Sequence, residues 1–158
     1  MPDIAVSTEI TAPAEAVYDL VADVTQMGRW SPEATGAEWL KGATGPAVGA
    51  RFKGSNRNES RRWSTTCTVV EADRGRAFSF DVTVGPLKIS RWAYRFTPAA
   101  GGGCTVVEEW TDQRPGFTKP LGKLASGVGD RLAHNRAGME QTLANLKAAA
   151  EGATSPSA

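Results

Sequence analysis

The sequence predicts an α+β fold: a seven-stranded, curved antiparallel sheet that wraps around a long C-terminal helix, with two short helices between strands 1 and 2. Three observations predict it. Apolar and polar residues alternate at 4–10 and in six further runs between residues 35 and 112. Helical spacing appears at 13–28, and again at roughly 119–151. The length of 158 residues fits one domain, 1–151, followed by a flexible tail at 152–158.

A change of period marks the first strand and the two short helices. Ile4, Val6 and Ile10 occupy alternate positions, as in a strand. Pro13 then suits the first turn of a helix whose apolar residues recur three and four positions apart. Pro32 ends the second short helix, because the residue before a proline avoids helical geometry. We therefore expect a kinked helix pair before strand 2.

The six later strands are separated by turn-forming residues such as Gly85-Pro86 and Gly101-Gly102-Gly103. At 78–84 and 92–96 every second residue is apolar or aromatic, so each strand has one apolar face. Connections this short join neighbouring antiparallel strands. We expect a meander that forms one curved sheet.

The closing segment, from Lys119 to Glu151, is predicted to be one long amphipathic helix that covers the apolar face of the sheet. Its apolar residues recur three, four and seven positions apart: Leu121, Leu124, Val128, Leu132, Met139, Leu143 and Leu146. Four glycines weaken this helix, most of them in its first half, where we expect a bend: Gly122, Gly127, Gly129 and Gly138.

Composition narrows the possible partners and compartments. Lysine and arginine number 18 against 17 acidic residues, so the chain lacks the basic field that nucleic acid binding requires. No apolar run reaches the roughly 20 residues of a membrane span. The first 25 residues hold no lysine or arginine, unlike a signal peptide. We expect a cytoplasmic protein, a monomer or weak homodimer, with no nucleic acid partner.

No metal site or cofactor is expected from the sequence. Cys67 and Cys104 are 37 residues apart in strand-like runs, with no neighbouring cysteine or histidine to complete a metal site. His134 is the sole histidine, and the helical wheel turns it away from the sheet. We expect the cysteines to be small buried residues in a reducing compartment.

Candidate binding residues lie on the faces predicted to point inward. Alternation places Arg61 and Trp63 on such a face of one strand, Trp92 and Tyr94 on another, and Glu108 and Trp110 on a third. Arg61, Tyr94 and Glu108 would then be polar groups among apolar neighbours, where the pKa of a carboxyl group rises or the carboxylate pairs with the arginine. A salt bridge at a strand end or at the rim of the covered face is the alternative interpretation for these polar groups, and core packing is the alternative for the aromatic residues. On the helical wheel Asn135 faces the sheet, so it contacts either a sheet group or a ligand. The predicted ligand-binding set is Arg61, Trp63, Phe80, Trp92, Tyr94, Glu108, Trp110, Asn135 and Met139. No catalytic residue can be assigned.

Several motifs resemble one known superfamily. They are the opening segment from Ile10 to Tyr18, the segment from Asp23 to Trp30 that continues into Ser31-Pro32, the strand from Trp92 to Phe96, and Gly138-Met139-Glu140 in the closing helix. In these the chain resembles the START-like, or Bet v 1-like (SRPBCC), helix-grip superfamily, in its polyketide cyclase/dehydrase-type bacterial branch, over residues 3–151. The resemblance implies a deep cavity between the sheet and the long helix that holds a hydrophobic or amphipathic small molecule.

Three functions follow as hypotheses. The first is binding of a lipid, a quinone or an aromatic polyketide-like metabolite in that cavity. The second is an enzyme of the polyketide cyclase or dehydratase type, which convergence of Arg61, Tyr94, Glu108 and Asn135 would favour. The third is a protein-docking regulatory module, which a filled cavity beside an exposed apolar patch would favour.

Overall fold

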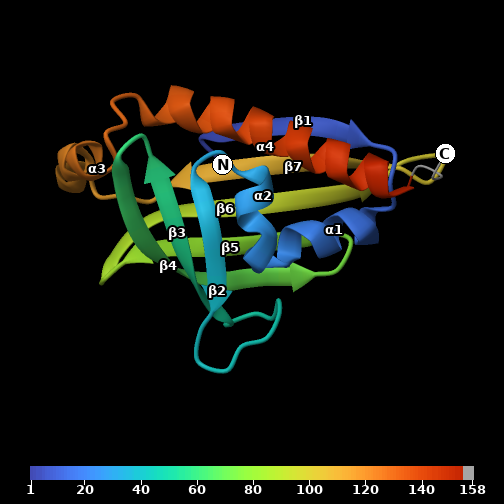
Figure 1. Ribbon diagram of the computed structural model, residues 1–158, viewed down its shortest axis with the longest axis horizontal. Helices are drawn as coiled ribbons and strands as arrows, with labels where there is room; N and C mark the ends of the chain where they lie inside the picture. Colours follow the sequence, from blue (N-terminus) through green and yellow to red (C-terminus); the bar gives the residue numbers. More distant parts are fainter. Residues whose placement is uncertain (155–158) are drawn as a thin grey trace.

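The computed structural model describes residues 1–154, and within them the predicted architecture is confirmed. Seven antiparallel strands form one sheet in the order β1-β7-β6-β5-β4-β3-β2 (Figure 1). The strands are β1 (Ile4–Ile10), β2 (Ala34–Trp39), β3 (Arg51–Asn58), β4 (Arg61–Asp73), β5 (Ala77–Val84), β6 (Leu87–Pro98) and β7 (Cys104–Asp112). Strands β2 to β7 form a meander. The first strand of the chain, β1, pairs with β7 at the edge of the sheet, with Ile4 opposite Trp110 and Ile10 opposite Cys104.

A kinked set of short helices joins β1 to β2, as the sequence predicts. It consists of α1 (Ala14–Ala22), the 3-10 turn η1 (Val24–Gln26) and α2 (Met27–Trp30). The Asp23 carboxylate makes the kink by accepting hydrogen bonds from the Thr25 amide at 3.2 Å and from Gln26 Nε2 at 2.7 Å. The buried face of α1 presents Tyr18, whose ring packs edge-on against Phe96 with a centroid distance of 5.7 Å.

The predicted long C-terminal helix is confirmed, but it begins at Arg131 rather than at Lys119, because the first part of the segment forms a short helix of its own. After the 3-10 turn η2 (Gly116–Thr118), the chain forms α3 (Lys119–Ser126), breaks, and forms α4 (Arg131–Thr154). Gly127 ends α3 in the left-handed conformation, with φ of 74°, which glycine adopts without the steric cost that a Cβ would bring. The expected tail begins at residue 152, yet α4 continues to Thr154, and the remaining residues of that tail lie outside the described part.

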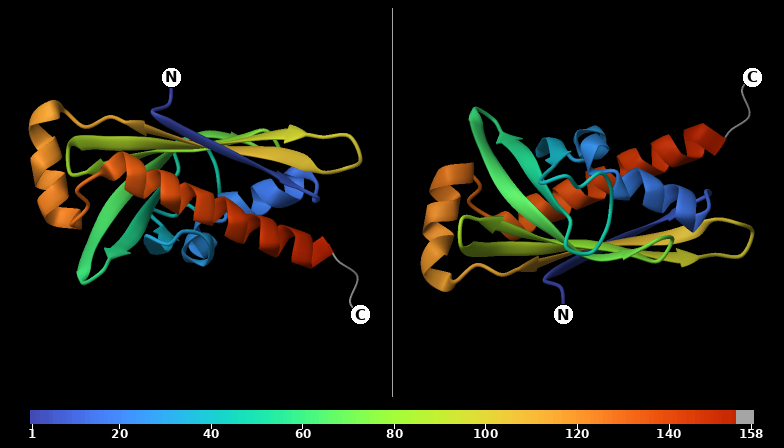
Figure 2. Two further views of the ribbon diagram at one scale, coloured as in Figure 1. Left: turned by 90° about the horizontal axis from the view of Figure 1, so that it is seen from above. Right: turned by 90° about the horizontal axis from the view of Figure 1, so that it is seen from below.

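α4 covers the sheet, packing chiefly against β1, and also contacts β7. Figure 2 shows it crossing on the same side as α1 and α2, with β3 and β4 curving toward it. Its buried face carries Met139, Leu143 and Leu146, whereas Leu121 and Leu124 of α3 are exposed. No helix in the described part of the chain is both long enough and apolar enough to cross a bilayer.

The interior contains two apolar cores. The larger contains Phe52, Phe78 and Phe80 together with residues of α1 and the end of α4. The smaller consists of Ile4, Trp110 and Met139. Val6 and Trp92 pack against both cores and so mark the line where they meet.

Candidate functional site

A polar pair lies at the line where the two cores meet. In the sheet register Glu108 of β7 is opposite Tyr94 of β6 on one side and Val6 of β1 on the other. Both polar side chains point to the covered face, because each is in phase with buried neighbours on its own strand. The Tyr94 hydroxyl donates a hydrogen bond of 2.8 Å to Glu108 Oε1. The structure therefore brings together two of the predicted site residues.

Burial dominates the electrostatics of this pair. Glu108 is 2% exposed, and loss of solvation raises the pKa of its carboxyl group to about 8, although the hydrogen bond from Tyr94 opposes the shift. Burial also raises the pKa of Tyr94 well above its ordinary value, and the neighbouring Glu108 charge adds to that effect. At neutral pH both groups are therefore protonated.

The second oxygen of Glu108 is the unusual feature. Oε2 is buried and has no hydrogen-bond partner among residues 1–154. Because Oε1 accepts from Tyr94, the acid proton belongs on Oε2, where it is a donor without an acceptor. A buried donor in this state costs about 1–3 kcal/mol. The arrangement can therefore donate one strong hydrogen bond to a carbonyl or hydroxyl oxygen.

Apolar side chains flank the pair on the α4 side. Trp92 and Trp110 are direct neighbours across β6 and β7, with ring centroids 6.5 Å apart and planes tilted by 59°. Met139 of α4 is 1% exposed and packs with Trp110. Three more predicted site residues thus lie near Tyr94 and Glu108.

Asn135 is buried in α4, as the helical wheel predicts, at 3% exposure. Its Oδ1 accepts a hydrogen bond of 3.4 Å from Arg131, and Arg131 also forms a 2.9 Å ion pair with Glu33, just before β2. His134 is half-buried rather than fully solvated, because its Nε2 lies 3.5 Å from a Glu33 oxygen. Asn135 therefore belongs to a network that joins the start of α4 to the start of β2.

Sequence patterns give no sign of that network. Arg131 also donates a hydrogen bond of 2.7 Å to the Ser126 hydroxyl, and the Asn58 side-chain amide donates one of 2.8 Å to the Ser126 carbonyl. These bonds hold β3, α3 and α4 together at this point. Its members lie up to 98 positions apart. Only the tertiary structure brings such residues together.

Three other predicted residues lie away from the pair. Arg61 is exposed at the start of β4 and lies against Gly127. The expectation that it lies beside Tyr94 and Glu108 is therefore wrong. The Phe80 ring packs between Phe52 at 5.2 Å and Phe78 at 5.8 Å, as a core residue does. Trp63 is half-buried toward the β3–β4 end of the sheet.

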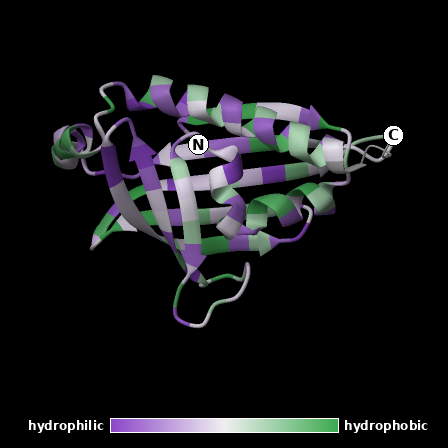
Figure 3. Ribbon diagram, in the orientation of Figure 1, coloured by the Kyte–Doolittle hydropathy of each residue, from purple (hydrophilic) through white to green (hydrophobic). Residues whose placement is uncertain are grey.

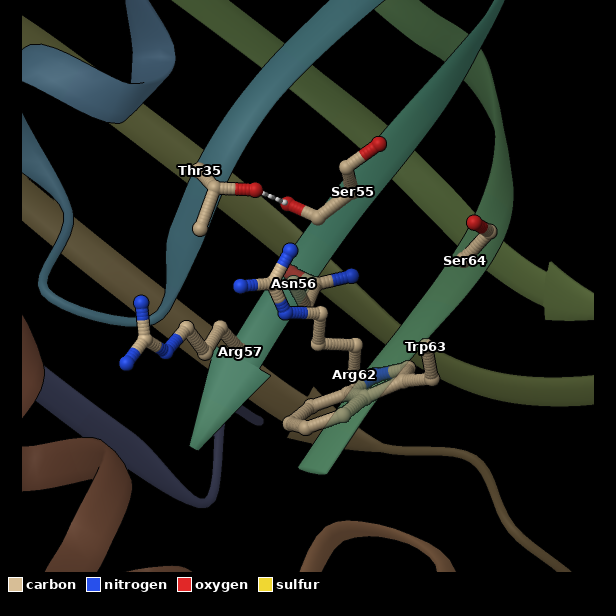
Figure 4. A pocket seen from close by; sticks show the side chains of 7 residues that line it. All are labelled: Thr35, Ser55, Asn56, Arg57, Arg62, Trp63 and Ser64. Atoms are coloured by element: carbon tan, nitrogen blue, oxygen red, sulfur yellow. Dashed lines mark hydrogen bonds between the residues drawn. The ribbon is translucent and has the colours of Figure 1, made fainter. Parts of the chain in front are cut away.

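Two hollows lie at that end of the sheet. The first, of about 610 Å³, is lined by Thr35 of β2, by Ser55, Asn56 and Arg57 of β3, and by Arg62, Trp63 and Ser64 of β4 (Figure 4). The second, of about 360 Å³, is lined by Arg61, Pro120, Lys123, Leu124 and Gly127. Neither is lined by Tyr94 or Glu108. Among residues 1–154, no group of three or more metal-ligating side chains is assembled.

Comparison with known proteins connects this geometry with a family. Residues 1–151 match the family model described as polyketide cyclase / dehydrase and lipid transport. No protein with a curated functional description matches the chain in sequence.

Solved structures share the fold. A polyketide cyclase-like protein of Corynebacterium glutamicum is 30% identical over 91% of this chain and 88% of its own, with a TM-score of 0.62. The di-domain ARO/CYC protein BexL from the BE-7585A biosynthetic pathway is 21% identical over 99% of this chain and 48% of its own (TM-score 0.68). Major latex-like protein 151 of Panax ginseng is 12% identical over 93% of this chain and 95% of its own, with a TM-score of 0.69. The last two are similar in fold alone.

Proposed function

Because the chain belongs to the polyketide cyclase / dehydrase and lipid transport family, we propose that it binds a hydrophobic or amphipathic small molecule between the sheet and α4, with one polar oxygen of the ligand on Glu108. The observation that carries the proposal is the buried, unpartnered Oε2 of Glu108. A ligand carbonyl or hydroxyl would satisfy it, and the apolar rings of Trp92 and Trp110 beside it suit a lipid, a quinone or an aromatic metabolite.

Entry of a ligand requires the two cores to separate where they meet. The break at Gly127 divides the C-terminal segment into two helices, and the Arg131–Glu33 ion pair ties the start of α4 to the sheet. Release of this tie would allow the N-terminal half of α4, which carries Met139, to move away from Trp110. We expect the bound ligand to occupy the space gained there, under the N-terminal half of α4.

Native mass spectrometry of the protein purified from its own source, followed by denaturing extraction, tests the proposal. We expect a retained apolar molecule, identified after extraction. Glu108→Leu should lower its affinity by about tenfold, because one buried hydrogen bond to the ligand is lost. Glu109→Leu is the matched control, since Glu109 is the next residue of β7, points to the other face and lies 3.6 Å from Arg95. Equal affinity in the two variants would refute the role of Glu108.

The protonated acid also favours a second function, an enzyme of the cyclase or dehydratase type. A carboxyl group with a pKa of about 8 can donate a proton to a substrate carbonyl near neutral pH. Glu108→Gln separates the two functions, because the amide keeps a hydrogen-bond donor but has no acid proton. Binding within a few-fold of wild type together with loss of turnover would support the enzyme.

A further inference from the structure

The exposed apolar side chains of this protein gather at one end of the molecule. Figures 1 and 2 both place α3, the β5–β6 turn and the β3–β4 turn at that end, and Figure 3 shows apolar residues on α3 and at the β5–β6 turn. We call this end the α3 face. Its exposed large apolar residues are Val84, Leu87, Phe117, Leu121, Leu124 and Leu132.

The centre of the α3 face is an apolar stripe on one helix. Phe117, Leu121 and Leu124 are four and three positions apart, so they share a side of η2 and α3. They are 79%, 64% and 71% exposed. A helix of a globular protein normally turns such a stripe to the core, whereas the buried residue of α3 is Ser126. The stripe has no partner within residues 1–154.

Positive charge surrounds the stripe. Two carboxylates at this end are already paired: Asp112 lies 2.8 Å from Arg114 and 3.6 Å from Lys119, and Glu33 lies 2.9 Å from Arg131. Glu59 and Asp130 are the acidic residues that oppose the remaining cations. The whole chain has a formal charge of only +1, so a local excess of cations is offset by acidic residues elsewhere in the chain. The cations of the α3 face outside these ion pairs are Arg57, Arg61, Arg62, Lys88 and Lys123.

A hollow of about 360 Å³ between α3 and β4 lies beside the stripe. Arg61 and Lys123 bring two cations to its wall, while Pro120 and Leu124 make the rest apolar. Guanidinium and ammonium groups together hold a phosphate oxygen well. An anionic headgroup with the first carbons of its chains fits this combination.

We propose that the α3 face docks on a lipid bilayer that carries anionic headgroups. Phe117, Leu121 and Leu124 enter the interface, and Arg61 and Lys123 hold a headgroup in the hollow. An amphipathic segment with large apolar residues on one side and lysines beside them binds membranes in this way, without spanning them. A second protein would also cover apolar residues, but the ring of cations favours an anionic surface. The proposal goes beyond the proposed function and does not depend on it.

Flotation of the full chain with vesicles tests the proposal, with no small-molecule ligand present. We expect binding to phosphatidylcholine vesicles that contain phosphatidylglycerol, weaker binding to phosphatidylcholine alone, and weakening by salt. Leu121→Ser/Leu124→Ser should reduce binding at least about tenfold, because less apolar area enters the interface. Arg61→Gln/Lys123→Gln should reduce it on the anionic vesicles only, because these two cations line the hollow.

Val48→Ser is the matched control. Val48 is 72% exposed in the loop between β2 and β3, away from the α3 face, and its loss should leave binding unchanged. Thermal unfolding of each variant checks that it is folded. Equal binding by wild type and Leu121→Ser/Leu124→Ser, or no binding to anionic vesicles, would overturn the proposal. So would a dimer in vesicle-free solution that the double serine variant abolishes, because it would assign the α3 face to a second copy of the chain.

Discussion

Glu108→Gln should keep the structure but change how the free energy of unfolding depends on pH. The glutamine side chain has nearly the same shape as the protonated acid, and its amide oxygen can accept the Tyr94 hydrogen bond of 2.8 Å. Wild type must either keep a proton on Glu108 or bury a charge as the pH rises. The variant needs neither.

The size of the effect follows from the pKa of Glu108, which burial raises from 4.5 to about 8. Between these values the folded protein holds a proton that the unfolded chain has released. The free energy of unfolding of wild type therefore falls by about 1.4 kcal/mol per pH unit from this group, and by roughly 5 kcal/mol over the whole interval. The stability that proton binding by Glu108 adds to the folded state is fully present below pH 4.5 and is lost as the pH rises to about 8.

Urea unfolding followed by tryptophan fluorescence at a series of pH values measures this difference. All other titrating groups are common to both proteins, so they cancel when the free energy of unfolding of wild type is subtracted from that of the variant. We expect the difference to rise in favour of glutamine up to a pH of about 8 and then to level off. A difference that does not vary with pH would refute the argument that Glu108 is protonated and buried.

Three further predictions concern the thiols, the tie between α4 and the sheet, and the helix break. Cys67 and Cys104 are buried, and burial raises the pKa of the Cys67 thiol to about 12, so Ellman's reagent should react only after unfolding; prompt reaction in the native protein would contradict this. Arg131→Ala removes the ion pair with Glu33, so it should cost about 1–3 kcal/mol of stability and speed tryptic cleavage of α3. Unchanged cleavage would argue against a tie between α4 and the sheet. Gly127→Ala should lower stability by about 1 kcal/mol in thermal unfolding because φ is 74°, and a neutral result would show that the left-handed turn relaxes.

The period of two along the strands is sufficient to predict the sheet and its covered face. Tyr94 and Glu108 were placed on that face correctly, because alternation decides which side of a strand each residue occupies. Alternation does not say how far apart two such residues are. β4 and β7 are separated by β6 and β5, so the two strands are three strand spacings apart, roughly 14 Å measured along the sheet.

Helical spacing misled the prediction at one point for a physical reason. Leu121, Leu124 and Leu132 continue the spacing of Met139 and Leu143, so a single wheel places all of them on the buried face. The left-handed turn at Gly127 ends the first helix, so Leu121 and Leu124 leave the buried face and are exposed. Leu132, in the first turn of α4, is exposed as well. Spacing alone does not distinguish a glycine that weakens a helix from one that ends it.

The protonation state of the Glu108 carboxyl group can be measured directly, and the proposed site depends on it. Its carbon resonance can be assigned by comparison with Glu108→Gln and followed against pH by NMR, first in the free protein and then with the extracted ligand. We predict a midpoint of about 8 in the free protein and a higher one with ligand, because a ligand oxygen that accepts the proton favours the neutral acid. A midpoint near 4.5, or one that the ligand does not move, would contradict the proposed site.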